Sequence, residues 1–245
     1  MSLTLKSNPM KFLLINARAI ICLVIIASLL SCKKKNEPEP LVITPTVNPI
    51  PYSVQAYLMT PADKTFNPDY YRAAKSTLIE LQGWYKTHMD NNKTFVLNSV
   101  VLDTITAMHN ANWFTKNNGD SINNGTVNYP FNNTKSELKQ LLGSKFDTTL
   151  YIYCAFVASP GFSDVTIPRG VGVLGEEILK ILAGSFPDDA KGETGHALGH
   201  AFGLPEVAVP NTDGIMSGGV YNYPDCVIKP WEKDSLNVSP FFKVQ

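Results

Sequence analysis

The chain has 245 residues, of which 44% are hydrophobic and 17% charged, and its 21 basic residues balance its 21 acidic ones. This size and composition are typical of one or two globular domains, and they exclude a fibrous or broadly disordered protein. The balanced charge provides no basic surface of the kind that binds nucleic acid, so we expect no nucleic-acid partner.

The first 31 residues have the pattern of a signal peptide. Lys6, Lys11 and Arg18 precede an apolar run at 19–30, which is shorter than the roughly 20 residues that span a bilayer. The run ends in Leu-Leu-Ser-Cys, which resembles a bacterial lipobox, where the peptide is cut before the cysteine and the cysteine carries lipid. This resemblance implies a lipoprotein of the cell envelope, attached to a membrane through Cys32 and facing either the periplasm or the exterior. Ordinary secretory cleavage, with Cys32 incidental, is the alternative.

A proline-rich segment follows the signal peptide. Five prolines between residues 38 and 51 favour an extended spacer, so we predict a tether over 32–60 and a folded domain over 61–245. The domain retains Cys154 and Cys226. In an oxidising compartment they could form a disulfide, whereas the apolar surroundings of Cys154 favour a buried free thiol; both interpretations stay open.

The domain alternates helical and strand patterns, which predicts an α/β (α+β) fold with one mixed sheet and helices packed on it. The Thr134-x-x-Glu137 pattern is typical of a capping box at the start of a helix that ends at Gly143. In chain order we predict a helix from Asn67 to Met89, a strand at 95–102, a helix at 104–114, a loop at 117–133, the helix from Thr134, strands at 150–158 and 170–174, and helices at 176–182 and from Lys229.

The segment at 193–206 carries the clearest chemical signal. His196 and His200 are four residues apart, which places both imidazoles on one face of a helix, where they could bind one Zn²⁺ at about 2.0–2.1 Å. Gly203 lets the chain leave the helix, and the turn returns Glu206 toward the histidines as a third ligand. An exposed loop carboxylate is the alternative for Glu206, and Asp213 is a second candidate for the third ligand.

This segment resembles the metzincin zinc-peptidase signature, His-Glu-x-x-His-x-x-Gly-x-x-His, in which the third ligand is sometimes a carboxylate. Gly214-Ile215-Met216-Ser217 resembles the Met-turn that lies beneath the metal in that family, although Met216 could simply fill the core. The resemblance covers roughly residues 66–245. It implies a metzincin-like fold with a twisted sheet, an active-site helix and a small irregular C-terminal subdomain, zinc as the cofactor, and 170–174 as the edge strand that aligns a peptide substrate.

The sequence departs from the signature at one position. Ala197 stands where the family has the glutamate that accepts a proton from the metal-activated water. General acid–base groups are typically worth 10²–10⁴-fold in rate, so the substitution predicts impaired hydrolysis. Glu193, four residues and one helical turn before Ala197, could replace that base, or it could simply be a first-turn glutamate that interacts favourably with the helix dipole. Natural loss of activity and deliberate replacement both remain open.

Other candidate side chains are weaker. Tyr221 and Tyr223 follow the turn, and in some metzincins a tyrosine there stabilises the oxyanion, but we expect core or rim positions for both. We expect His88 and His109 to be surface or hydrogen-bonded histidines. The sequence thus predicts a membrane-anchored zinc metallopeptidase-like lipoprotein that acts on a protein or peptide, with a non-catalytic zinc- or peptide-binding lipoprotein as the alternative.

Overall fold

The computed structural model describes residues 49–116, 129–160, 164–165, 170–207 and 212–245. The predicted signal peptide, Cys32 and most of the tether predicted for 32–60 lie outside these residues. In the described part of the chain, no helix is long and apolar enough to cross a membrane. The strands are β1 (Ser53–Thr60), β2 (Lys93–Phe95), β3 (Asp103–Thr106), β4 (Tyr151–Val157), β5 (Asp164–Val165), β6 (Val171–Leu174) and β7 (Phe242–Val244).

Helices alternate with these strands, as the sequence predicted. The α-helices are α2 (Pro68–His88), α3 (Tyr129–Leu142), α4 (Glu176–Leu182), α5 (Asp188–Ala201) and α6 (Pro230–Asn237). Short 3-10 helices are η1 (Asp90–Asn92), η2 (Ala111–Trp113), η3 (Gly143–Lys145) and η4 (Gly218–Asn222). The predicted bounds of α4 agree with the structure, and α2 begins as expected at Asn67, whose side chain caps the helix.

The main sheet has the order β3-β1-β4-β6-β5. β1, β3, β4 and β6 are parallel, and β5 pairs with β6 in the antiparallel direction. The edge strand at the β6 side is therefore β5, not the predicted segment 170–174, which forms an internal strand. β2 and β7 form a separate antiparallel pair.

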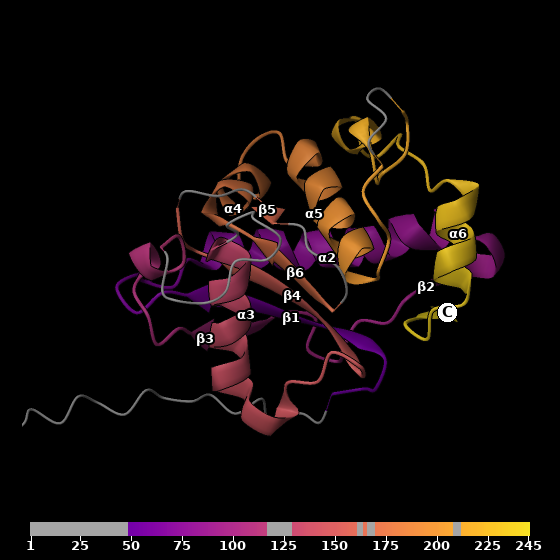
Figure 1. The fold of residues 1–245 in the computed structure, drawn as a ribbon. Helices are drawn as coiled ribbons and strands as arrows, with labels where there is room; N and C mark the ends of the chain where they lie inside the picture. Colours follow the sequence, from indigo (N-terminus) through magenta and orange to yellow (C-terminus); the bar gives the residue numbers. More distant parts are fainter. Residues whose placement is uncertain (1–48, 117–128, 161–163, 166–169, 208–211) are drawn as a thin grey trace, which may run out of the picture. The chain divides into compact units, whose positions relative to one another are not determined.

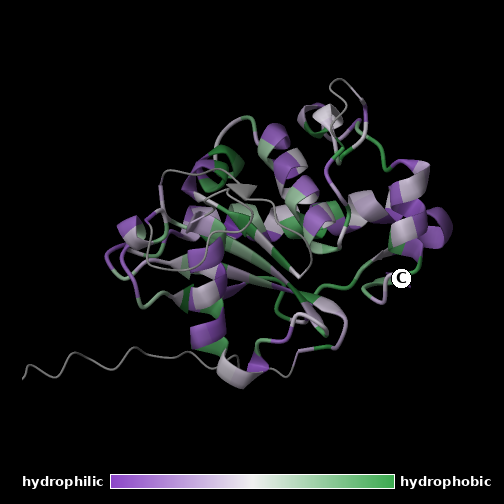
Figure 2. Ribbon diagram, viewed as in Figure 1, coloured by the Kyte–Doolittle hydropathy of each residue, from purple (hydrophilic) through white to green (hydrophobic). Residues whose placement is uncertain are grey.

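Both faces of the main sheet are covered, because alternate residues of β4 enter two different cores. Ile152, Cys154 and Phe156 pack with α2, α4 and α5, whereas Tyr153 and Ala155 pack with α3 on the other face. In Figure 1, α3 lies on one side of the strands and α2, α4 and α5 lie on the other. Figure 2 shows hydrophobic residues along the strands and hydrophilic ones on the outer sides of the helices. The fold is thus the mixed α/β class predicted from the sequence.

Three predicted segments differ from the structure. The predicted tether over 32–60 ends too late in the sequence, because residues 53–60 form β1, which is fully buried between two strands. The predicted helix at 104–114 is instead β3 followed by η2, since pairing with β1 recruits this segment into the sheet. The predicted strand at 95–102 is also wrong beyond its first residue, because β2 ends at Phe95.

The helix α3 begins before the predicted capping box. It starts at Tyr129, so Thr134 and Glu137 lie inside the helix and are both buried. Its end agrees with the prediction, since Gly143 follows directly with a φ of 56° that favours glycine.

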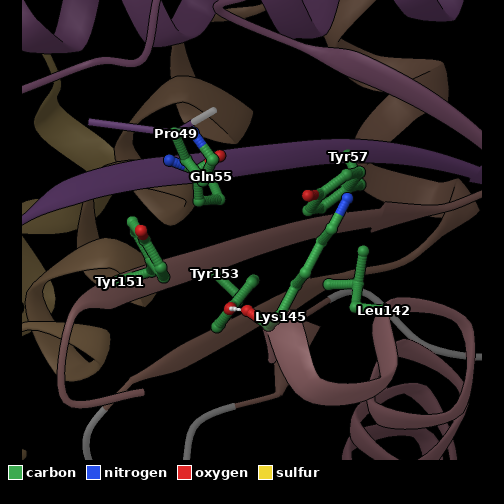
Figure 3. Close-up of a pocket in the computed structure, with 7 residues that line it drawn as sticks. All are labelled: Pro49, Gln55, Tyr57, Leu142, Lys145, Tyr151 and Tyr153. Carbon is green, nitrogen blue, oxygen red and sulfur yellow. Dashed lines mark hydrogen bonds between the residues drawn. The ribbon is translucent and has the colours of Figure 1, made fainter. Parts of the chain in front are cut away.

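A small cavity of about 20 Å³ lies between β1, β4 and the end of α3. Figure 3 shows Tyr57, Tyr151 and Tyr153 around it, with the hydroxyl of Tyr153 donating to the backbone oxygen of Lys145 at 3.0 Å. Burial raises the pKa of Tyr153 to about 12, so this hydroxyl stays neutral. A space of this size holds about one water molecule, so we assign the cavity to packing and not to substrate binding.

Candidate metal centre

The two histidines of the motif project from α5 to the same place. His196 and His200 are one turn apart, and their Nε2 atoms lie 3.0 Å from each other. Both residues are buried. The helix therefore delivers two imidazole nitrogens to a single point, as the spacing predicted.

Backbone carbonyls hold the opposite nitrogen of each ring. His196 Nδ1 lies 2.8 Å from the oxygen of Ile215, and His200 Nδ1 lies 2.9 Å from the oxygen of Leu204. A carbonyl oxygen can only accept, so Nδ1 of each ring carries the proton and donates it. Each Nε2 of the neutral ring then has its lone pair available for a metal, which is the usual arrangement of zinc-bound histidine.

Burial also favours the neutral form of His200. Desolvation, followed by the nearby His196, lowers the pKa of His200 below its usual value. A histidine must be neutral to bind a metal, so the burial of His200 supports ligation near neutral pH.

Gly203 turns the chain at the end of α5. Its φ is 101°, in the left-handed region that favours glycine. The amide of Leu204 donates to the oxygen of Gly199 at 2.9 Å, and the amide of Gly203 donates to the oxygen of His200 at 2.8 Å. This pair of bonds is a Schellman motif, which ends the helix and reverses the chain.

The reversal brings Glu206 back to the histidines. Its Oε2 lies 3.0 Å from Nε2 of His200 and 3.2 Å from Nε2 of His196. Two ligand atoms of a tetrahedral zinc are separated by about 3.3 Å, so the three atoms have nearly the spacing of one face of such a site. Two imidazoles and one carboxylate are also a donor set that zinc accepts. The residues present therefore fit the ion.

The turn at Gly214–Ser217 lies against α5. The amide of Ser217 donates to the oxygen of Gly214 at 3.1 Å, and Met216 is completely buried. A Cβ on Gly199 would stand under 3.0 Å from the sulfur of Met216. The amide of Val207 also donates to the oxygen of Met216 at 3.2 Å. The predicted Met-turn segment thus contacts both α5 and the loop segment that contains Glu206.

Ala197 places no polar group in this centre. It is 1% exposed and belongs to the core beneath α5. Its backbone oxygen faces β6, where a Cβ on Gly172 would lie 3.3 Å away. Glu193, the other candidate base, is partly buried one turn ahead of His196 on the same helix. Neither residue belongs to the group of donor atoms formed by His196, His200 and Glu206.

Three weaker candidates point elsewhere. Asp213 pairs with the ammonium group of Lys229, whose hydrogen bond lowers the pKa of the carboxyl group, so it is not the third ligand in this arrangement. The hydroxyl of Tyr223 donates to Glu80 at 3.1 Å, and Tyr221 is 62% exposed. The expectation of core or rim positions for both tyrosines agrees with the structure.

Among the described residues, Cys154 and Cys226 are free thiols, so the disulfide interpretation is wrong. Cys154 lies on β4, and Cys226 lies between η4 and α6; both are buried in the same core. Burial raises the pKa of each thiol to about 12, which keeps them protonated and unreactive.

His109 is a hydrogen-bonded histidine, as expected, but the sequence did not predict its partner. His109 Nδ1 lies 2.7 Å from a carboxylate oxygen of Glu137, although the residues are 28 positions apart. The only available signal was an acidic residue among apolar positions of a helix, which the capping-box interpretation had already explained. His88 stacks on Trp84 with ring centres 4.2 Å apart, as expected of a structural histidine.

The described residues thus place three donor atoms together on a mixed α/β fold. The fold is similar to that of catalytically inactive OgpA from Akkermansia muciniphila, whose structure was determined in complex with an O-glycopeptide (glycodrosocin) substrate. The comparison also gives archaemetzincin (amzA) from Methanopyrus kandleri. OgpA is 15% identical with a TM-score of 0.55, and the match covers 84% of this chain and 66% of that chain, just under two thirds. Archaemetzincin is 12% identical with a TM-score of 0.40, covering 74% of this chain and 92% of that chain. No family model and no curated protein sequence matches this chain.

Proposed function

We propose that this protein is a zinc-binding, metallopeptidase-like lipoprotein whose hydrolytic activity is impaired by Ala197. The observation that carries the proposal is the group of three donor atoms from His196, His200 and Glu206, separated by 3.0–3.2 Å on a metallopeptidase-like fold. Zinc in such a site supplies a Lewis acid that polarises a carbonyl group and activates water.

The chain's own residues supply only part of the machinery for peptide hydrolysis. The two buried imidazoles and Glu206 would hold the ion, and the hydrogen bonds to Ile215 and Leu204 orient the rings. What the described site lacks at position 197 is a carboxylate to accept the proton of the attacking water. Without that group we expect a rate about 10²–10⁴-fold below that of a complete site.

Zinc binding is tested without any activity measurement. The zinc affinity of the purified protein would be measured by competition with a chromophoric chelator, for the unmodified chain and for His200→Ala. We expect one zinc per chain and a loss of affinity of more than about 100-fold in the variant, because a direct ligand is worth more than the 10–100-fold of an outer-shell partner. His88→Ala, which removes a histidine outside the cluster, is the matched control. Equal affinities in all three proteins would rule out the proposed site.

Catalysis is tested by restoring the missing carboxylate. The zinc-loaded protein and Ala197→Glu would be compared on unfolded casein and on an O-glycopeptide, since the OgpA complex contains a substrate of that class. We expect Ala197→Glu to be faster by about 10²–10⁴-fold. Full activity of the unmodified protein, abolished by a chelator, would show that another group acts as the base, and Glu193→Gln would then be the next variant.

A second candidate function is a non-catalytic binder of peptides that retains the zinc. The observation that favours it is Ala197 itself, which is packed into the core with no carboxylate at its position. Zinc binding without turnover, together with retention of a casein peptide, would support this alternative.

Membrane attachment through Cys32 remains a proposal that rests on the lipobox-like sequence. In a bacterial host that processes lipoproteins, we expect the full chain in the membrane fraction of the cell envelope and Cys32→Ser outside it. A membrane-bound Cys32→Ser protein would contradict this anchor.

A further inference from the structure

A second candidate site lies at the carboxyl ends of β1 and β3, where the loop that includes η2 forms a pocket of about 500 Å³. We call it the His109 pocket. Its size is within the range of about 300–1,000 Å³ that is typical of small-molecule sites. Side chains that line it include Asp63, His109, Asn110, Asn112, Trp113 and Lys116.

The imidazole of His109 is fixed in this pocket by a buried acid. Its Nδ1 lies 2.7 Å from Oε2 of Glu137, whose side chain is completely buried. The other oxygen of Glu137 accepts from the amide of Met108. The imidazole also stacks on Trp113, with ring centres 3.9 Å apart and planes 9° apart. Because Nδ1 is engaged by Glu137, Nε2 is the ring nitrogen left to meet a ligand.

Hydrogen bonds from buried side chains also fix the backbone that forms the pocket. The buried amide of Asn133 donates to the oxygens of Trp113, Phe114 and Lys116 at 2.9–3.0 Å. The hydroxyl of Ser159 donates to the oxygen of Ala111 at 2.7 Å. The pocket is therefore preorganised, which reduces the entropy lost when a ligand binds.

The lining combines opposite charges with groups that both donate and accept. Asp63 only accepts hydrogen bonds and Lys116 only donates them, whereas the side-chain amides of Asn110 and Asn112 do both. The two charges oppose each other, so the lining does not select a strongly charged ligand. Hydroxyl groups both donate and accept, and the stacked rings of His109 and Trp113 add flat apolar surface for C–H groups. We propose that the His109 pocket binds a carbohydrate.

This site is separate from the metal centre. Glu137 and Asn133 belong to α3, which packs on one face of the sheet, whereas His196 and His200 belong to α5 on the other face (Figure 1). Binding at the His109 pocket should therefore be the same with and without zinc, and its test is independent of the proposed peptidase-like function.

The proposal is tested by titrating the protein with lactose, maltose, cellobiose and N,N′-diacetylchitobiose, using calorimetry and tryptophan fluorescence. We expect at least one disaccharide to bind with a Kd of about 1 mM or tighter. Asn112→Ala and Lys116→Ala change exposed side chains, so they should fold normally and weaken binding at least about tenfold if each loses one hydrogen bond. Lys139→Ala, on the exposed side of α3, is the matched control and should bind as the unmodified protein does.

His109→Gln adds a test of the ring itself. Glutamine can still donate to Glu137, but it loses the stacking surface, so we expect weaker sugar binding in a folded protein. Failure of all four disaccharides to bind would overturn the proposal. Binding that is unchanged in both Asn112→Ala and Lys116→Ala would also overturn it, as would binding that disappears when a chelator removes zinc.

Discussion

Two helices on the same face of the sheet, α2 and α5, are built by opposite means. α2 has 21 residues, a side-chain cap from Asn67, and large buried residues such as Leu78 and Leu81. α5 has 14 residues, no side-chain hydrogen bond at its N-cap, and glycines at 192, 195 and 199. Glycine in a helix costs roughly 1 kcal/mol relative to alanine, so α5 is the weaker helix in isolation.

The glycines of α5 are required by close packing, whereas the glycine of α2 is not. A Cβ at Gly192, Gly195 or Gly199 would stand under 3.0 Å from Val220, Ile215 or Met216, whereas nothing lies within 4 Å of such an atom at Gly83 of α2. The close approach brings the oxygen of Ile215 to His196. The comparison teaches that α2 is specified by its own sequence, whereas α5 depends on the segment packed against it.

The largest effect is expected at Gly192. Gly192→Ala would drive a methyl group into the backbone oxygen of Val220, which cannot rotate away, so we expect a loss of about 3 kcal/mol in the free energy of unfolding. Urea denaturation of the purified variant measures it. A neutral substitution would mean that α5 and η4 are not in direct contact, which would break the comparison.

Gly199→Ala should be less severe, because its methyl group would meet the flexible side chain of Met216. We expect a loss of about 1–3 kcal/mol in the free energy of unfolding. The zinc affinity should also fall, because the substitution displaces the turn that orients His196. In a Met216→Ala background the same substitution should cost clearly less, since the two side chains compete for one space. Equal costs in both backgrounds would contradict this contact.

Asn67→Ala tests the local specification of α2. The side chain of Asn67 accepts from the amide of Asp69 at 2.9 Å, and its removal should lower the free energy of unfolding by about 1 kcal/mol. The zinc affinity should not change, because this cap lies on another helix. Urea denaturation and the chelator competition give the two readings, and a change in zinc affinity would count against the independence of the two helices.

Gly83→Ala is the matched control for both glycine variants of α5. Open space surrounds this position in the middle of α2, so the added methyl group should raise the free energy of unfolding by about 0.5–1 kcal/mol. This change in the free energy of unfolding has the opposite sign to the changes expected for Gly192→Ala and Gly199→Ala. Urea denaturation measures all three variants. A destabilised Gly83→Ala would remove the contrast between the helices.

The smallest effect concerns pH. Glu232 of α6 lies near His196 of α5 and is 1% exposed. Burial raises the pKa of the Glu232 carboxyl group. In the unfolded chain Glu232 ionises at its usual, lower pKa of about 4.3. At a pH above its folded pKa, ionisation of the buried Glu232 therefore lowers the free energy of unfolding, whereas below about pH 4.3 the group is protonated in both states and has no such effect. Glu232→Gln keeps an acceptor for the amide of Lys229. We expect this variant to be more stable at pH 7, with the advantage vanishing near pH 4, in denaturation at both pH values. A constant difference would contradict the assignment.

The sequence predicts best where a segment specifies itself. The start of α2 and the bounds of α4 follow from local periodicity and capping, and the convergence of His196, His200 and Glu206 follows from helical spacing and one glycine. β1 was not predicted because prolines precede it and because its residues Ser53 and Gln55 are polar. Both of these polar residues are nevertheless buried. Their burial is made possible by a hydrogen bond between them at 2.8 Å and by Asn98, which donates to Gln55 at 3.2 Å.

Long-range pairing explains the remaining errors. The segment at 103–106 forms a strand because β1 is beside it, and no local pattern records that partner. Asp213 faces Lys229, 16 residues later, and Glu137 faces His109, 28 residues earlier. In each case the side chain's partner lies on another element, so residue type alone suggested a different role.

The position of β1 has a mechanical consequence. It is the first strand of the described chain, yet it lies inside the sheet, with parallel neighbours β3 and β4 on its two sides. A force that pulls on the residues ahead of Ser53 acts along the strand, so it would load the hydrogen bonds to both neighbours together in shear instead of peeling them one at a time. The domain would thus resist tension through an internal strand that is buried along its whole length.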